Sequence, residues 1–260
     1  MPASDLPLLI EAAREAGRIA SRYTGESAKR WDKPGGLGPV TEADMAVNEM
    51  LERDLRAARS GYGWLSEETE DGAGRLGRDH VFIIDPIDGT RSFIEGSATW
   101  AHSLAVAEKG VVTAAVIYLP LRNKFYAAAT GQGATLNNAP ITVSPRKTLP
   151  GAHFMAAKPN LDARNWKGGH VPEVRRSHRP SLAYRLSLVA EGRYDAMLTL
   201  RRSWEWDIAA GDLILREAGA VTSDRAGQPL RFNNAEPLLN GVIAANPDLQ
   251  PSILDALAIG

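Results

Sequence analysis

The 260-residue sequence has no cysteine, which excludes disulfides, thiolate metal sites and cysteine nucleophiles. It also lacks a long hydrophobic run, because the longest apolar stretch, residues 111–120, is far too short to cross a bilayer. Neither sign of charge is in excess, since 30 basic and 31 acidic residues leave a net charge of −1. That balance gives no reason to expect a nucleic acid polymer or a membrane as a partner. The first residues carry Asp5 and no lysine or arginine, unlike a signal peptide, so we expect a soluble cytoplasmic protein.

The composition is that of a globular protein, with 44% hydrophobic and 23% charged residues, and it suits one large domain or two small ones packed closely. Apolar residues at helical spacing predict helices over 5–24 and 41–58, joined by a glycine- and proline-rich flexible connection at 33–39. Short apolar runs then predict strands at 80–84, 101–108, 111–119 and 124–129. The turns between the last three are short, so we expect these strands to pair antiparallel.

The second half of the chain alternates strands and helices instead. Its patterns predict strands at 154–157, 196–200 and 242–245 and helices at 181–191, 206–218 and 251–258. The change of pattern places a boundary near 142–150, which divides the chain into an N-terminal part, 1–145, and a C-terminal part, 146–260. This order of elements predicts helices layered on two sheets.

The most distinctive segment, Asp85-Pro86-Ile87-Asp88-Gly89-Thr90, follows a predicted buried strand. Because proline cannot donate to a sheet, the strand cannot simply continue as a central one, which places the two carboxylates on a sharp turn at a sheet edge. Taken alone, the segment also fits an ordinary turn in which Gly89 has a positive φ and Asp88 caps a helix. However, the acidic stretch 64–70 follows another short apolar strand, and carboxylates without histidine or cysteine suit Mg²⁺.

Two further acids stand at the starts of predicted helices. Asp207 opens an apolar helix, where a carboxylate also interacts favourably with the helix dipole. Asp44 lies in Thr41-Glu42-Ala43-Asp44, which has the spacing of a capping box. For both residues, a structural role and a role in the site remain open at this point.

In order along the chain, the sequence has Val40-Thr41-Glu42-Ala43-Asp44, Ser66-Glu67-Glu68-Thr69, the segment 85–90 and Trp206-Asp207-Ile208-Ala209-Ala210-Gly211. This set resembles the magnesium-dependent, lithium-sensitive phosphatases of the inositol monophosphatase superfamily. Their pattern is Asp-Pro-(Ile/Leu)-Asp-Gly-Thr early and Trp-Asp-x-Ala-Ala/Gly-Gly late. The resemblance covers nearly the whole chain. It implies the alternating α-β-α-β-α sandwich of inositol monophosphatase and fructose-1,6-bisphosphatase, often as a homodimer.

The resemblance also implies a mechanism in which two or three Mg²⁺ ions per active site serve the hydrolysis of a small phosphate ester by water. The implied metal ligands are Glu67, Asp85, the carbonyl of Ile87, Asp88 and Asp207. Thr90, oriented by Asp44, would position or deprotonate the attacking water, and Glu67 would share in catalysis. The implied substrate contacts are Asp88, Gly89, Thr90, Ser181, Arg201 and Arg202.

The choice of phosphate ester depends on weaker signals. Arg91-Ser92-Phe93-Ile94 is similar to the Lys-Glu-Phe-Ile of 3′(2′),5′-bisphosphate nucleotidases in this superfamily. Residues 196–203 have no carboxylate to accept sugar hydroxyls, and Arg201 and Arg202 suit a second phosphate. We therefore expect hydrolysis of adenosine 3′,5′-bisphosphate to AMP. The match is incomplete, because the Ser-Ser-Leu-Lys of many nucleotidases is replaced by Pro180-Ser181-Leu182-Ala183.

Other substrates and another class of function remain open. The alternatives are an inositol-1-monophosphatase or broad-specificity monophosphatase, and a histidinol-phosphate or sugar-bisphosphate phosphatase. Lys158 and the basic run 175–179 either contact a second phosphate or are solvated surface. A non-catalytic relative that binds metal or a phosphorylated metabolite as a regulator usually loses a metal carboxylate, whereas all of them are present here, so we expect an enzyme.

Overall fold

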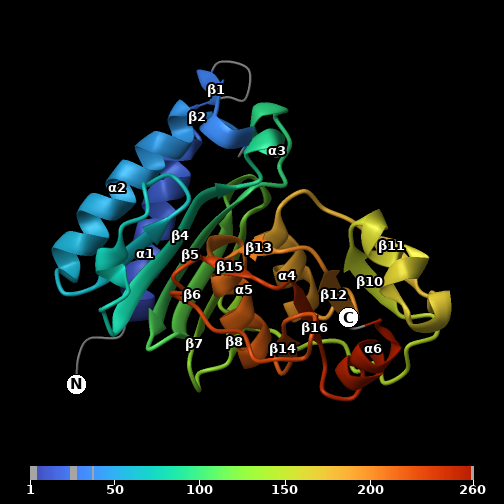
Figure 1. Ribbon diagram of the computed structural model, residues 1–260. Helices are drawn as coiled ribbons and strands as arrows, with labels where there is room; N and C mark the ends of the chain where they lie inside the picture. The colour runs from blue at the N-terminus through green and yellow to red at the C-terminus, as the bar shows by residue number, and fades with distance from the viewer. Residues whose placement is uncertain (1–4, 24–27, 37, 259–260) are drawn as a thin grey trace.

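The computed structural model describes residues 5–23, 28–36 and 38–258, and these form alternating layers of helices and sheets (Figure 1). Helices α1 (Asp5–Ala20) and α2 (Glu42–Ala58) make one outer layer. A seven-stranded sheet follows, and behind it lie α4 (Leu182–Ala190) and α5 (Glu205–Glu217). A five-stranded sheet comes next, and α6 (Gln250–Ala256) covers its far side. The α-β-α-β-α order expected from the sequence is confirmed.

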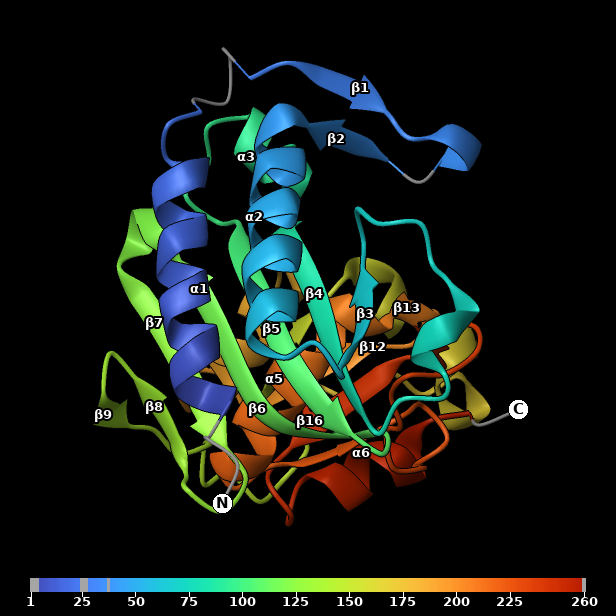
Figure 2. The ribbon, with the colours of Figure 1, turned by 90° about the vertical axis from the view of Figure 1, so that its left-hand side faces the viewer.

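The seven-stranded sheet has its strands in chain order, and only the first pair, β3 and β4, is parallel. Its strands are β3 (Gly63–Ser66), β4 (His80–Asp88), β5 (Ala101–Glu108), β6 (Val111–Leu119), β7 (Lys124–Ala129), β8 (Ala134–Leu136) and β9 (Ala139–Pro140). Side chains of β4 alternate between two buried faces: Phe82 and Ile84 pack with α1 and α2, whereas Val81 and Ile83 pack with α4 and α5. Burial on both faces explains why this strand is a continuous apolar run. Figure 2 shows α1 and α2 side by side across the sheet.

The five-stranded sheet has the order β11-β10-β12-β16-β14. Its strands are β10 (His153–Ala156), β11 (Arg175–Ser177), β12 (Ala196–Thr199), β14 (Val221–Ser223) and β16 (Val242–Ala245). Strand β10 is parallel to both of its neighbours, and β16 is antiparallel to β12 and β14. Two further pairs stand apart from both sheets: β1 (Arg30–Asp32) with β2 (Pro39–Thr41), and β13 (Ser203–Trp204) with β15 (Leu238–Leu239).

Helices α4 and α5 cross closely in the middle layer because α5 has a glycine at the contact. A Cβ on Gly211 would lie 2.4 Å from Cδ1 and 2.7 Å from Cβ of Leu186 in α4. Any larger residue would therefore push the helices apart. This contact brings the start of α5, which carries Asp207, beside the turn of α4 that carries Arg185.

Most predicted elements are confirmed within a residue or two, and three expectations need correction. The helix predicted over 5–24 ends at Ala20, and its expected end at 24 lies outside the described residues. The connection at 33–39 is mostly the loop of the β1–β2 hairpin, and residue 37 lies outside the described residues. The hairpin was not predicted because the exposed strand β1 has no apolar pattern. Strand β4 continues past Pro86 to Asp88, with a register shift between Asp85 and Asp88.

The continuation of β4 past Pro86 is compatible with proline, which has no backbone N–H to donate to a neighbouring strand. Strand β3 pairs with β4 only as far as Ile84, so the last residues of β4 are paired with β5 alone. Gly89, with φ 97°, then turns the chain into the short helix α3 (Thr90–Ile94). The division at 145 stays a prediction, although one buried cluster joins the two sheets across it. None of the described helices is both long and apolar enough to cross a membrane.

Candidate active site

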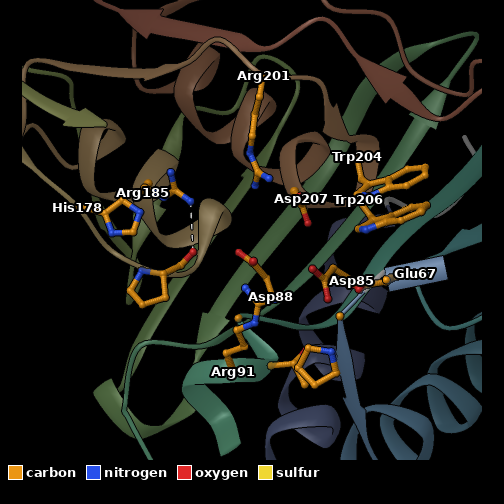
Figure 3. A pocket seen from close by; sticks show the side chains of 16 residues that line it. Glu67, Asp85, Asp88, Arg91, His178, Arg185, Arg201, Trp204, Trp206 and Asp207 are labelled. Carbon is orange, nitrogen blue, oxygen red and sulfur yellow. Dashed lines mark hydrogen bonds between the residues drawn. The ribbon is translucent and has the colours of Figure 1, made fainter. Parts of the chain in front are cut away.

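The segments that carry the predicted motifs meet around one cavity of about 590 Å³ (Figure 3). It lies where the carboxyl ends of β3 and β4 meet the first turn of α5 and the start of α4. Its lining consists of Gly36, Gly38, Pro39, Glu67, Asp85, Asp88, Gly89, Thr90, Arg91, His178, Pro180, Arg185, Arg201, Trp204, Trp206 and Asp207.

Three carboxylates form the centre of the cavity. Glu67, Asp85 and Asp207 each offer an oxygen, and these oxygens all lie within 4.8 Å of one another. Parallel pairing of β3 and β4 accounts for the first two, since Ser66 pairs with Ile84 and the amide of Glu67 donates to the carbonyl of Ile84 at 3.2 Å. Asp207 comes from the first turn of α5, which is tied to β5 because Ser103 Oγ donates to the carbonyl of Trp206 at 3.0 Å.

The negative charges of these three carboxylates would be stabilised by a bound cation. Both carboxylate oxygens of Asp85 are buried and have no hydrogen-bond partner among the described residues. Burial, and then the charge of Glu67, raise the pKa of Asp85 well above its usual value, and burial together with Asp88 does the same for the pKa of Asp207. A buried carboxylate without donors, with two further carboxylates beside it, matches the oxygen ligands of a hard divalent cation, so the residues present fit Mg²⁺.

Asp88 stands beside the three carboxylates and is held by the start of α4. Its Oδ2 accepts hydrogen bonds from Ser181 Oγ and from the amide of Ala183, both at 2.6 Å. Burial raises the pKa of Asp88, and these donors oppose the rise. Ser181 is fully buried and also caps α4 by accepting from the amide of Tyr184. The structure therefore gives Ser181 a role in orienting Asp88, and direct contact with a substrate stays a prediction.

Thr90 is joined to Asp44, as expected. Its hydroxyl lies 3.2 Å from both Asp44 Oδ1 and the carbonyl of Ile87, and it can donate to either. Asp44 also completes a capping box with Thr41 at the start of α2, which confirms its structural role. Its role in catalysis stays a prediction. Burial raises the pKa of Asp44 to about 6. A carboxyl with that pKa can accept a proton near neutral pH.

Lys33, in the loop of the β1–β2 hairpin, is a contact that the sequence did not reveal. Its Nζ donates to Glu67 Oε1 at 2.7 Å and to Glu68 Oε1 at 2.6 Å, which fastens the hairpin over the carboxylates. Burial and the charge of Glu67 raise the pKa of Glu68 to about 7 despite this ion pair. No signal in the glycine- and proline-rich segment around Lys33 pointed to this ion pair.

The rest of the cavity lining is mainly basic and aromatic. Arg185 and Arg201 line it, together with His178, and Trp204 and Trp206 stack with ring centroids 4.7 Å apart and planes 8° from parallel. Arg185 and the two tryptophans were not among the predicted site residues. Arg202, which was predicted, is absent from the lining of this cavity; its exposed guanidinium forms an ion pair with Glu236.

The basic run 175–179 is only partly at the cavity. His178 lines it, whereas Arg175 and Arg176 lie on the edge strand β11. Lys158 opens a short 3₁₀ helix, Lys158–Leu161, and is likewise absent from the lining.

This fold and this carboxylate cavity define a hydrolase of the metal-dependent phosphatase class. The chain belongs to the inositol monophosphatase family, whose model matches residues 3–259. It is 33% identical to an inositol-1-monophosphatase of Mesorhizobium japonicum, over 97% of this chain and 95% of the relative. It is 36% identical to the Nus factor SuhB of Pseudomonas aeruginosa, over 85% and 86% of the two chains.

Solved structures agree with this assignment. The extragenic suppressor protein suhB from Bartonella henselae matches with a TM-score of 0.80 and 31% identity over 98% of both chains. The inositol monophosphatase TM1415 of Thermotoga maritima matches with a TM-score of 0.79 and 27% identity, over 96% of this chain and 95% of its own. Magnesium dependence and lithium sensitivity are typical of the family. The nucleotidase branch expected from residues 91–94 is not confirmed by these relatives.

Proposed function

We propose that this chain hydrolyses the phosphate monoester of a small metabolite, with water as the nucleophile and Mg²⁺ as the cofactor. The observation that carries the proposal is the buried carboxylate of Asp85, whose oxygens have no donor and lie beside Glu67 and Asp207. Glu67, Asp85, Asp207, Asp88 and the carbonyl of Ile87 would hold two or three magnesium ions. When bound, these would lower the pKa of the attacking water and offset the negative charge on the leaving alkoxide.

The chain's own residues have separate tasks in this proposal. Thr90 Oγ1 accepts a proton from the attacking water and passes its own to Asp44 Oδ1, 3.2 Å away. The water oxygen forms a bond to phosphorus as the ester bond between phosphorus and the metabolite oxygen breaks, and that metabolite oxygen takes a proton from solvent. Gly89 has a left-handed backbone conformation and directly precedes α3. Gly89 and Thr90 line the cavity, where the phosphate would lie. Lys33 holds Glu67 and Glu68 in place.

A phosphate-release panel tests the proposal. Inositol 1-phosphate, adenosine 3′,5′-bisphosphate, histidinol phosphate and fructose 1,6-bisphosphate are compared by kcat/KM with Mg²⁺ and with EDTA. We expect release from at least one ester with Mg²⁺ and none with EDTA. Release that survives EDTA, or no release from any ester, would contradict the proposal. The name of the Mesorhizobium relative supports inositol 1-phosphate, and the arginines in the cavity support a bisphosphate.

A role as a Nus factor is a second candidate, because several relatives of 30–36% identity carry that name. The two functions separate in a strain that lacks its own copy of this chain. If Asp85→Asn restores growth as well as the natural protein does, while releasing no phosphate, the second role does not need catalysis. A cytoplasmic location and a homodimer also remain proposals.

A further inference from the structure

Two arginines in the cavity wall have no carboxylate partner among the residues that the structure describes. Arg185, on α4, is only 6% exposed, and its Nε and Nη2 donate to backbone carbonyls, those of Ser181 at 3.3 Å and Pro180 at 3.2 Å. Arg201, after β12, extends into the cavity toward Asp207 (Figure 3). Within the described part of the chain, Arg185 has no ion pair, and the side chain of Arg201 has neither an ion pair nor a hydrogen bond.

Other arginines show how this fold treats a guanidinium that is purely structural. Arg75 is 3% exposed, and its Nε and Nη2 each donate to one carboxylate oxygen of Asp71, at 2.6 and 2.7 Å. Arg216 also has a carboxylate partner, because its Nε donates to Asp212 Oδ2 at 3.0 Å. A buried cation without such a partner is costly, and removal from water lowers the pKa of Arg185, as does the neighbouring charge of Arg201.

The nearest compensation for the two arginines is the field of the carboxylates. Asp88 and Asp207 raise the pKa of Arg185, so they attract its charge without contacting it. Divalent cations on these carboxylates would cancel that attraction. The two guanidiniums would then face the cavity as uncompensated charge, next to the place where the scissile phosphate is bound.

Resting on the proposed function, we propose that Arg185 and Arg201 bind a second phosphate of the substrate, one that is not cleaved. The substrate class is therefore a small metabolite with two phosphates. Guanidinium groups bind phosphate through paired hydrogen bonds, which a hydroxyl cannot offer. Arg201, open to solvent, meets the incoming phosphate, and Arg185 is held in its orientation by the two backbone carbonyls.

Matched substrate pairs measure this subsite. Each pair differs by one phosphate: adenosine 3′,5′-bisphosphate against adenosine 3′-phosphate, and fructose 1,6-bisphosphate against fructose 1-phosphate. For at least one pair, we expect kcat/KM to favour the bisphosphate by about 10-fold or more, the order of a charged hydrogen bond. Arg201→Ala should remove most of that preference, because it should lower kcat/KM for the bisphosphate more than for the monophosphate. Arg164→Ala, an exposed arginine paired with Asp162, is the matched control.

Because Arg185 is buried, its test uses Arg185→Lys, which keeps the charge and loses the paired geometry. Arg185→Lys should also reduce the preference in kcat/KM for the bisphosphate. Its thermal midpoint should stay within a few degrees of that of the natural protein. A second readout does not depend on turnover: calorimetric titration of Asp85→Asn protein with each adenosine nucleotide, with and without Arg201→Ala. The bisphosphate should bind more tightly than the monophosphate, and Arg201→Ala should remove that difference in affinity.

The outcomes separate the subsite from the proposed activity. If no ester releases phosphate, the proposed function fails, and the titration still decides the subsite. If phosphate is released but kcat/KM is equal within each pair, the subsite is overturned, and the inositol 1-phosphate alternative is favoured. The assignment to a second phosphate is wrong if a monophosphate with a carboxylate, such as 3-phosphoglycerate, shows an equally raised kcat/KM that Arg201→Ala removes.

Discussion

Replacing Asp85 with asparagine should abolish turnover and yet stabilise the metal-free protein. Turnover is lost because the neutral amide no longer offers two anionic oxygens at the centre of the carboxylate group. Stability rises because the carboxylate of Asp85 is buried without donors and repels its neighbours. This opposite movement of activity and stability distinguishes a metal site from an ordinary structural acid.

The magnitude follows from the geometry. At 4.8 Å and an effective dielectric constant of about 20, two carboxylates repel each other by about 3.5 kcal/mol, and Asp85 has two such neighbours. The repulsion cannot destabilise the folded protein by more than the cost of protonating Asp85 instead. For an aspartate of usual pKa 3.8, protonation at pH 8 costs about 6 kcal/mol. The new amide lacks partners, which removes about 1–3 kcal/mol of the gain. We expect a net gain of about 2 kcal/mol or more, which raises Tm by about 4 °C or more.

Thermal melts in EDTA and in Mg²⁺, at pH 5 and pH 8, check this prediction. In EDTA at pH 8 the variant should melt above the natural protein, and at pH 5 the gap should shrink, because Asp85 then takes up its proton cheaply. In Mg²⁺ the order should reverse, since only the natural protein gains the full binding energy. Asp212→Asn is the matched control: its carboxylate is also buried but accepts from Arg216 and Thr222, so the variant should be destabilised in every condition. An Asp85 variant less stable than the natural protein in EDTA at pH 8, or with more than about a tenth of its kcat, would refute the reasoning.

Three further predictions concern the neighbours of this group. Thr90→Ala should lower kcat by about 10-fold or more and change KM less, because the hydroxyl acts on the attacking water; steady-state kinetics check this, and an effect on KM alone would limit Thr90 to ground-state binding. Ser181→Ala should cost about 1 kcal/mol in urea unfolding through loss of the α4 cap, and should weaken Mg²⁺ binding because Asp88 loses a donor; unchanged Mg²⁺ affinity would exclude the second role. In EDTA, stability should fall as pH rises from about 4 to about 7, because burial raises the pKa of Asp44 to about 6 and of Glu68 to about 7, so the folded protein binds more protons than the unfolded chain; melts that improve across this range would contradict the assignment.

The parts of the fold that the sequence predicted best are those with strong local signals. Strands β5, β6 and β7 are apolar runs between short turns, and their bounds match the prediction. The start of α2 was readable from the capping box at Thr41 and Asp44. The very short strands, such as β9 and β13, were missed because two residues carry no periodicity.

The carboxylate side of the site was predictable for the same reason, since its residues stand at strand ends and helix starts. The basic side was not. Arg185 lies inside an apolar helix, and a single sequence does not tell which face of that helix meets the cavity. Arg201 and Arg202 are adjacent in the irregular segment between β12 and β13, so only the structure shows that Arg201 faces the cavity and Arg202 meets Glu236.

The origin of the three central carboxylates links the site to the packing of the layers. Glu67 and Asp85 are neighbours because β3 and β4 are parallel, so the first sheet alone brings them together. Asp207 comes from α5, which is docked on that sheet by the bond from Ser103 to the carbonyl of Trp206 and packs closely against α4 at Gly211. Without a cation, the mutual repulsion of these groups opposes the docking. A divalent cation at this point would therefore hold α5 against the sheet as well as serve the reaction.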